Sequence, residues 1–301
     1  MAIWILSSNR ICEPRPPARC AKRQRPPMTT YKMWRSSAMA SMLVVVGGMA
    51  PAHETAIDPA LLMVQSGDCP IVISAPHGGS KPIPGVPPRH GKDARKFVTV
   101  RDDGTEVLAH LLADRLEKKL GRKPHLVVAY FHRKCVDVNR PGDDAFESDL
   151  AKPYYEAYHQ ALAAAHAAVV KRYGRGILID LHGQAADKDA IFRGTNNLKS
   201  VSHLVNRSGK GALLGKGGLL GELGLRNRTL IPANDSDSTE DPRFTGGYIT
   251  QTYGSRQGGT VDAVQLELGS SLRRAPGRDE FANDLAEAVA AFSARYLPGK
   301  D

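Results

Sequence analysis

The chain has 301 residues, of which 42% are hydrophobic, 24% charged and 6% aromatic, and its formal net charge is +10. These proportions exclude collagen-like, disordered and disulfide-dense proteins and indicate an ordinary globular chain. Most of the charge lies at the start, because residues 1–52 hold eight Lys or Arg and a single acid. The body of the chain is therefore only slightly basic, and no nucleic-acid partner is expected.

Residues 1–52 are interpreted as a basic leader that contains a signal peptide. Residues 38–48 form an uncharged run of the length of a signal-peptide core, which is too short to span a bilayer. Ala50 and Ala52 then offer small side chains for cleavage. Cleavage would give an exported protein, periplasmic or secreted, without stable membrane anchoring. The alternative is a flexible tail on a cytoplasmic protein.

From residue 53 to residue 301, apolar runs alternate with helical patterns. Short apolar or β-branched runs predict strands at 71–75, 126–130, 177–181 and 264–268. Amphipathic or Ala-rich patterns predict helices at 105–120, 154–173 and 281–296. This alternation predicts a single α/β domain over 53–301, with a mostly parallel sheet flanked by helices.

The glycine-rich stretch 208–224 does not have the spacing of a phosphate-binding loop. The required glycine five residues before Gly215 is replaced by Lys210, and Gly217 stands where Ser or Thr should follow Lys216. We expect a mobile loop or a loose helix there, and not a nucleotide site.

Residues able to do chemistry gather where the predicted strands end. His77 follows the first strand, Arg133 follows the second, and His182 follows the third, while Glu267 lies in the last strand. Ligands of open α/β sheets bind outside the carboxyl ends of the strands, so these side chains are expected to share one edge of the sheet.

His77 and His182 each precede a glycine, where the backbone can turn sharply and bring two imidazoles to one metal ion. The alternative for each is a histidine that bonds a backbone carbonyl at the strand end. A catalytic zinc usually takes a third protein ligand. The acids that open the helix at 105–120 are candidates, namely Asp102, Asp103 and Glu106, although plain helix capping would also explain them.

Glu267 stands within an apolar strand, where a carboxylate needs a partner. It is either half of a buried salt bridge or a general base that takes a proton from water and passes it to a leaving amine. Asn139, Arg140 and Arg133 are candidates for binding a substrate carboxylate, because Arg binds carboxylates at two points. The alternative for the arginines is an ordinary surface position.

Six short motifs occur in the order seen in one enzyme family. They are Ala75-Pro-His77-Gly-Gly, Asp102-x-Gly-Thr-Glu106, Asp137-Val-Asn139-Arg140, Asp180-Leu-His182-Gly, Gly246-Gly-Tyr248-Ile-Thr250 and Gln265-Leu-Glu267. Over residues 70 to 270 the chain thus resembles the N-formylglutamate amidohydrolases, relatives of the zinc carboxypeptidases and succinylglutamate desuccinylases.

The resemblance implies a phosphorylase/hydrolase-like three-layer α/β fold with a central mixed, mostly parallel sheet. It implies a hydrolase with one zinc ion that cuts the amide of an N-acylated amino acid. His77 and His182 would bind the ion, with Glu106 as third ligand and Asp102 as the alternative. Glu267 would be the general base, and Arg133 would polarise the scissile carbonyl.

On the substrate side, the resemblance implies that Asn139 and Arg140 bind a carboxylate and that Gly247 and Tyr248 shape the pocket. The partner would be a small N-acylated amino acid or an acidic peptide. Two other functions stay open at this point. One is hydrolysis of γ-glutamyl or cell-wall peptides, and the other is non-catalytic binding of acidic peptides by an exported protein.

Overall fold

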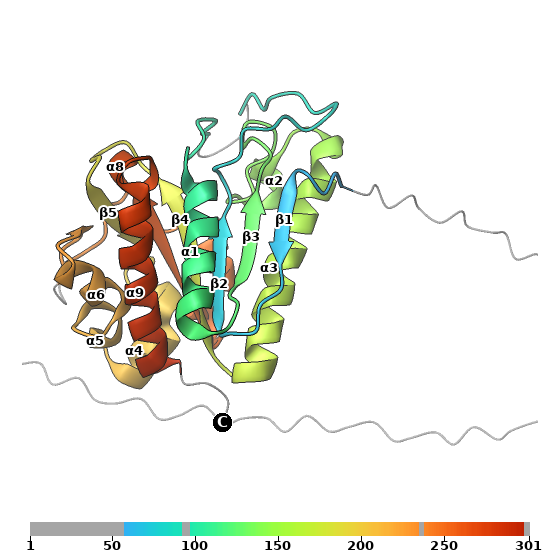
Figure 1. Ribbon diagram of the computed structural model, residues 1–301. Helices are drawn as coiled ribbons and strands as arrows, with labels where there is room; N and C mark the ends of the chain where they lie inside the picture. Colours follow the sequence, from blue (N-terminus) through green and yellow to red (C-terminus); the bar gives the residue numbers. More distant parts are fainter. Residues whose placement is uncertain (1–56, 92–96, 235–237, 298–301) are drawn as a thin grey trace, which may run out of the picture. The chain divides into compact units, whose positions relative to one another are not determined.

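Figure 1 shows the computed structural model of the chain, which describes residues 57–91, 97–234 and 238–297. The predicted leader at 1–52, with its signal peptide, lies outside the described residues. In the part that the structure describes, no helix combines the length and the apolar character that crossing a bilayer requires.

Seven strands of the described residues form one mixed sheet in the order β1-β3-β2-β4-β7-β5-β6. β2 pairs in parallel with β3 and β4, β4 with β7 and β5 with β6, whereas β1 and β5 run antiparallel to β3 and β7. The strands are β1 (Leu62–Gln65), β2 (Ile71–Ala75), β3 (His125–Ala129), β4 (Gly176–Gly183), β5 (Ala190–Gly194), β6 (Thr229–Ile231) and β7 (Val261–Leu268).

Helices cover both faces of this sheet, so the predicted three-layer α/β fold is confirmed (Figure 1). α1 (Thr105–Leu120) and α9 (Arg278–Tyr296) pack side by side on one face, and α3 (Lys152–Tyr173) packs on the other. The shorter helices are α2 (Gly142–Ala145), α4 (Ser202–Ser208), α5 (Gly211–Leu214), α6 (Leu219–Leu225), α7 (Tyr248–Tyr253) and α8 (Ser270–Arg273). The glycine-rich stretch at 208–224 thus contains α5 and all of α6 except its last residue.

Two apolar cores lie on the two faces because successive strand side chains point in opposite directions. In β2, Ile71 and Ile73 join the core beneath α1 and α9, and Val72 joins the core beneath α3. α1 contributes Leu108 and Leu112, which are fully buried and spaced at one helical turn. Full burial of each such side chain contributes about 1.5–3 kcal/mol.

The same alternation decides where the polar side chains of β4 and β7 lie. Leu178 of β4 and Ala263 of β7 belong to the core beneath α3. His182 and Glu267 follow them at even spacing, so they lie on this face at the carboxyl ends of their strands. The two are direct partners across the parallel pair. The fold therefore places an imidazole beside a carboxylate at the edge where ligands bind.

Gly104, immediately before α1, lies where a larger residue should destabilise the protein. Its φ is +89°, and a Cβ there would collide with the carbonyl oxygen of Arg273. Gly104→Ala should therefore lower the free energy of unfolding by about 2–4 kcal/mol in urea titrations followed by circular dichroism.

Gly121, at the other end of α1, is the matched control. Its φ is also positive, at +64°, but an added Cβ would meet nothing within 4 Å. Gly121→Ala should cost only about 1–2 kcal/mol, for the left-handed backbone alone. Equal losses in the two variants would show that the contact with Arg273 has no effect.

Candidate metal centre and active site

A pocket of about 290 Å³ opens at the carboxyl ends of the parallel strands. Residues from the loops after β2 and β3, from the ends of β4 and β7, and from the segment before α7 form its wall. The lining residues include His77, Val98, Val100, Asp102, Arg133, Arg140, His182, Gly247 and Glu267.

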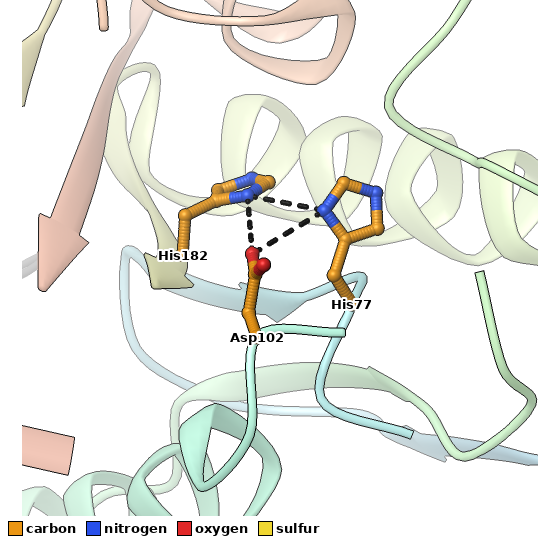
Figure 2. A group of neighbouring side chains, drawn as sticks. All are labelled: His77, Asp102 and His182. Carbon is orange, nitrogen blue, oxygen red and sulfur yellow. Dashed lines mark hydrogen bonds and ion pairs between the residues drawn. The ribbon is translucent and has the colours of Figure 1, made fainter. Parts of the chain in front are cut away.

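His77, Asp102 and His182 all line this pocket, and Figure 2 shows their side chains turned toward one another. The Nδ1 atoms of the two imidazoles are 3.2 Å apart. Asp102 Oδ2 lies 3.1 Å from His182 Nδ1 and 3.4 Å from His77 Nδ1. All three side chains are buried. The prediction that two histidines and an acid, far apart in the chain, share one place thus agrees with the geometry.

The outer nitrogen of each imidazole bonds a second buried carboxylate. His77 Nε2 lies 2.7 Å from Asp137 Oδ1, and His182 Nε2 lies 3.0 Å from Asp180 Oδ2. Each Nε2–H group donates to one of these carboxylates, so the Nδ1 atom of each ring carries the lone pair. The two lone pairs then face each other and the Asp102 oxygen. The three atoms that face one another are then all electron-pair donors, which is the donor set that a divalent cation accepts.

The charges around the three side chains favour a positive charge among them. Burial by itself lowers the pKa of His182, but the Asp180 and Asp102 carboxylates outweigh it and raise that pKa well above its ordinary value. Burial acts in the opposite direction on Asp102, where the bonds to His182 and His77 prevail and lower the pKa of the carboxyl. The residues present therefore fit a bound metal ion.

Asp102, the alternative third ligand of the sequence interpretation, lies with the two histidines, and Glu106 does not. The backbone N–H of Asp102 donates to the carbonyl of His77 at 2.9 Å, which holds the two residues together. Glu106 Oε2 instead accepts the backbone N–H of Gly104 at 3.1 Å. Burial raises the pKa of the Glu106 carboxyl. Glu106 thus caps α1, which is the helix-capping alternative given above for these acids.

Glu267 lines the pocket and is 9% exposed. Burial raises the pKa of its carboxyl to about 7, against the opposing charge of His182. Gln265, two residues earlier on the same face, donates from Nε2 to Glu267 Oε1 at 2.7 Å. A carboxyl group with a pKa near neutrality can both accept and release a proton, which is what a general base that later serves as acid needs.

Arg133 lies beside the candidate metal ligands. Its Nη2 donates to Asp137 Oδ2 at 2.7 Å, and its Nη1 is 3.6 Å from Asp102 Oδ1. Burial by itself lowers the pKa of Arg133, but Asp137 and Asp102 outweigh it and raise that pKa. The guanidinium therefore stays charged at the pocket wall, next to Asp102.

Of the four residues predicted for the substrate side, three line the pocket and one does not. Arg140 and Gly247 line the pocket. Asn139 lines it too, but its amide is engaged within the protein, because Oδ1 accepts the Ile249 N–H at 2.8 Å and Nδ2 donates to Gln265 Oε1 at 3.4 Å. Tyr248 lies outside the lining, with its ring against that of His159.

Asp137 and Asp180, for which the sequence alone predicts no role, orient the two imidazoles. Both stand within the motifs quoted above, two residues from an already selected Asn or His. A carboxylate that bonds the outer nitrogen of a ligand histidine is a common feature of metal centres. That expectation could have selected them once the histidines were assigned to a metal.

The pocket is strongly basic outside the metal-binding group. Its lining contains five arginines, which are Arg101, Arg133, Arg140, Arg243 and Arg273. Asp102 and Glu267 are the acids among the lining residues. Such a concentration of guanidinium groups attracts anionic ligands and can bind a carboxylate at two points.

Comparison with known proteins confirms the family resemblance. The family model for N-formylglutamate amidohydrolase matches residues 147–273. None of the curated proteins compared with the chain matches it. The match includes His182 and Glu267, and it supports an amidohydrolase-like function.

Two solved structures share the fold. One is an N-formylglutamate amidohydrolase from Ralstonia eutropha, with 17% identity and a TM-score of 0.54, covering 79% of this chain and 98% of that one. The other is a gene product of Agrobacterium tumefaciens, with 14% identity and a TM-score of 0.50, covering 80% of this chain and 97% of that one. At these identities the likeness establishes the architecture.

Glu240 anchors the segment that forms one wall of the pocket, so its removal should destabilise the protein. Its carboxylate accepts Arg193 Nε at 3.0 Å and the backbone N–H groups of Thr195 and Asn197, and Glu240, Arg193 and Thr195 are buried. Glu240→Ala would leave the Arg193 charge buried without its carboxylate partner. It should lower the free energy of unfolding by about 3–5 kcal/mol.

The neighbouring acid supplies the control. Asp241 pairs with Arg243, whose side chain is 63% exposed, so solvent screens this pair. Asp241→Ala should therefore leave the midpoint of the same urea titration almost unchanged. A Glu240→Ala loss no larger than that of Asp241→Ala would contradict the assigned anchoring role.

Proposed function

We infer that this chain, which matches the N-formylglutamate amidohydrolases, is a zinc-dependent hydrolase of the amide bond in N-acylated amino acids. The observation that carries the inference is the convergence of His77, Asp102 and His182 beside Glu267 in a basic pocket. One zinc ion would be held by the Nδ1 atoms of His77 and His182 and by a carboxylate oxygen of Asp102. Two imidazoles and one carboxylate form a common ligand set of catalytic zinc sites that leave a position open.

The chemistry that zinc supplies when bound is Lewis-acid catalysis, which polarises a carbonyl and lowers the pKa of a water towards about 7. The protein contributes the proton transfers. Glu267 accepts a proton from the attacking water and delivers it to the leaving amine. Its pKa of about 7 suits both steps near neutral pH.

The arginines orient the substrate and stabilise the developing charge. Arg140 is the candidate for binding the carboxylate of the amino-acid part, since the amide of Asn139 is engaged within the protein. Arg133 lies next to Asp102 and stabilises the oxyanion formed from the scissile carbonyl. Binding at both ends fixes the amide in one position, which lowers the entropic part of the barrier.

Removal of single carboxylates tests which acid binds the metal. Asp102→Asn should lower zinc affinity at least about 100-fold, measured by competition with a chromophoric chelator, because one of three ligands is lost. Glu106→Gln should stay within about threefold of the parent protein, because Glu106 bonds the start of α1. The reverse order of effects would assign the third ligand to Glu106.

Hydrolysis assays test the function itself. The parent protein with added zinc should hydrolyse at least one of a series of N-formyl, N-acetyl and N-succinyl amino acids, and chelation should abolish the activity reversibly. Glu267→Gln should keep stoichiometric zinc and lose about 10²- to 10⁴-fold in kcat, because only the proton acceptor is removed.

Two outcomes would contradict the proposal. A Glu267→Gln variant with full turnover would remove the proposed general base. A zinc-free parent protein that binds N-acyl amino acids or acidic peptides without cleaving them would instead favour a non-catalytic binder. Cleavage of γ-glutamyl peptides alone would move the substrate class to peptides.

A further inference from the structure

One wall of the pocket is apolar, in contrast to the arginines around it. Residues 97–100 (Phe-Val-Thr-Val) carry no charge, and Val98 and Val100 line the pocket. Val100 is 75% exposed and Val98 is 39% exposed, whereas the valines of the sheet core are almost fully buried. Exposed apolar side chains at the wall of a binding pocket mark a surface that becomes covered when a ligand binds.

The backbone of this wall is held in place from inside the protein. Arg89 Nη2 donates to the carbonyl of Val98 at 3.1 Å, and Arg133 Nη1 donates to the carbonyl of Val100 at 3.4 Å. Both guanidinium groups are buried. The two valines are therefore presented to the pocket by a fixed segment, so a ligand that covers them does not have to order that segment first.

The apolar wall lies close to the candidate metal ligand Asp102, and this position relates it to the acyl end of the substrate. Val100 precedes Asp102 by two residues, so its Cα lies within about 7 Å of the Cα of the candidate metal ligand. The scissile carbonyl must lie at the metal, and the acyl group is bonded directly to that carbonyl. The amino-acid part extends from the same amide toward an arginine that binds its carboxylate.

We propose that Val98 and Val100 form a subsite for an apolar acyl group, and that the preferred substrates are N-acyl acidic amino acids with an acyl chain longer than formyl. The proposal rests on the proposed amidohydrolase function and deepens it by naming the substrate class. Basic and apolar walls in one pocket fit a ligand that is anionic at one end and apolar at the other.

A chain-length series tests this subsite. The zinc-loaded protein is assayed with N-formyl, N-acetyl, N-butyryl and N-hexanoyl glutamate. Each added methylene should raise kcat/KM about twofold to fourfold until the wall is covered. In Val100→Ser and Val98→Ser, the ratio of kcat/KM for hexanoyl over formyl substrate should fall at least about fivefold.

Val64 supplies the matched control, since it is an exposed valine on β1, is 51% exposed, and is not among the residues that line this pocket. Val64→Ser should keep the parent hexanoyl-to-formyl ratio. A rate that falls with chain length, or a ratio unchanged in both wall variants, would overturn the subsite. So would a series of N-formyl amino acids in which apolar side chains, and not acyl length, raise kcat/KM.

The failure of this inference and the failure of the proposed function give different results. If N-formylglutamate is hydrolysed and the longer acyl chains are not, the amidohydrolase function stands and the subsite is wrong. If no N-acyl amino acid of any length is hydrolysed by the zinc-loaded protein, both fall.

Discussion

Asp137 and Asp180 each accept a hydrogen bond from the outer nitrogen of an imidazole, and these two bonds orient the rings of His77 and His182. A free imidazole can turn over or change its tautomer, and either change would remove a lone pair from the centre. With both rings fixed from behind, the inner nitrogens and Asp102 present three electron-pair donors to one point. The metal chemistry proposed for this protein depends on that orientation.

This arrangement concentrates negative charge in the protein interior, and cationic side chains offset it. Burial by itself would raise the pKa of Asp137, yet His77 and Arg133 lower it well below its ordinary value. Arg89 adds a further charge 3.7 Å from the same carboxylate. A buried carboxylate that lacked such partners would be protonated and could not hold its histidine. Arg133 and Arg89 thus help to keep the Asp137 carboxylate ionised.

The same arginines connect the proposed metal site to the apolar wall of the pocket. Arg133 bonds Asp137 on one side and the carbonyl of Val100 on the other. Arg89 likewise bonds the carbonyls of Arg133 and Val98. The loop that ends at Asp102 is therefore held against the loop after β3 by buried charged groups. A change in either guanidinium would disturb both the orientation of His77 and the position of the apolar wall.

Local patterns in the sequence determined the elements and the set of candidate residues. β2 and α1 have the predicted bounds, and the strand predicted at 126–130 is observed one residue earlier, at 125–129. Apolar periodicity fixes such elements because it reports which face is buried. The strands β1, β5 and β6 were not predicted. β1 and β6 are partly exposed strands at the two edges of the sheet, and Arg193 interrupts the apolar run of β5, so none of them has the continuous apolar run of β2 and β3.

Only the tertiary structure decided which of these candidates lie together. Asp102 and Glu106 are four residues apart at the start of one helix, and no local pattern separates a metal ligand from a helix cap. The hydrogen bond from Asp102 to the carbonyl of His77 makes the distinction, and it joins segments 25 positions apart in the chain. The roles of Asp137 and Asp180 behind the imidazoles, and the engagement of the Asn139 amide by Ile249, depend in the same way on contacts between distant loops. Interactions between residues close in the chain determine a helix or a strand, whereas a site of this kind exists only where the ends of several strands meet.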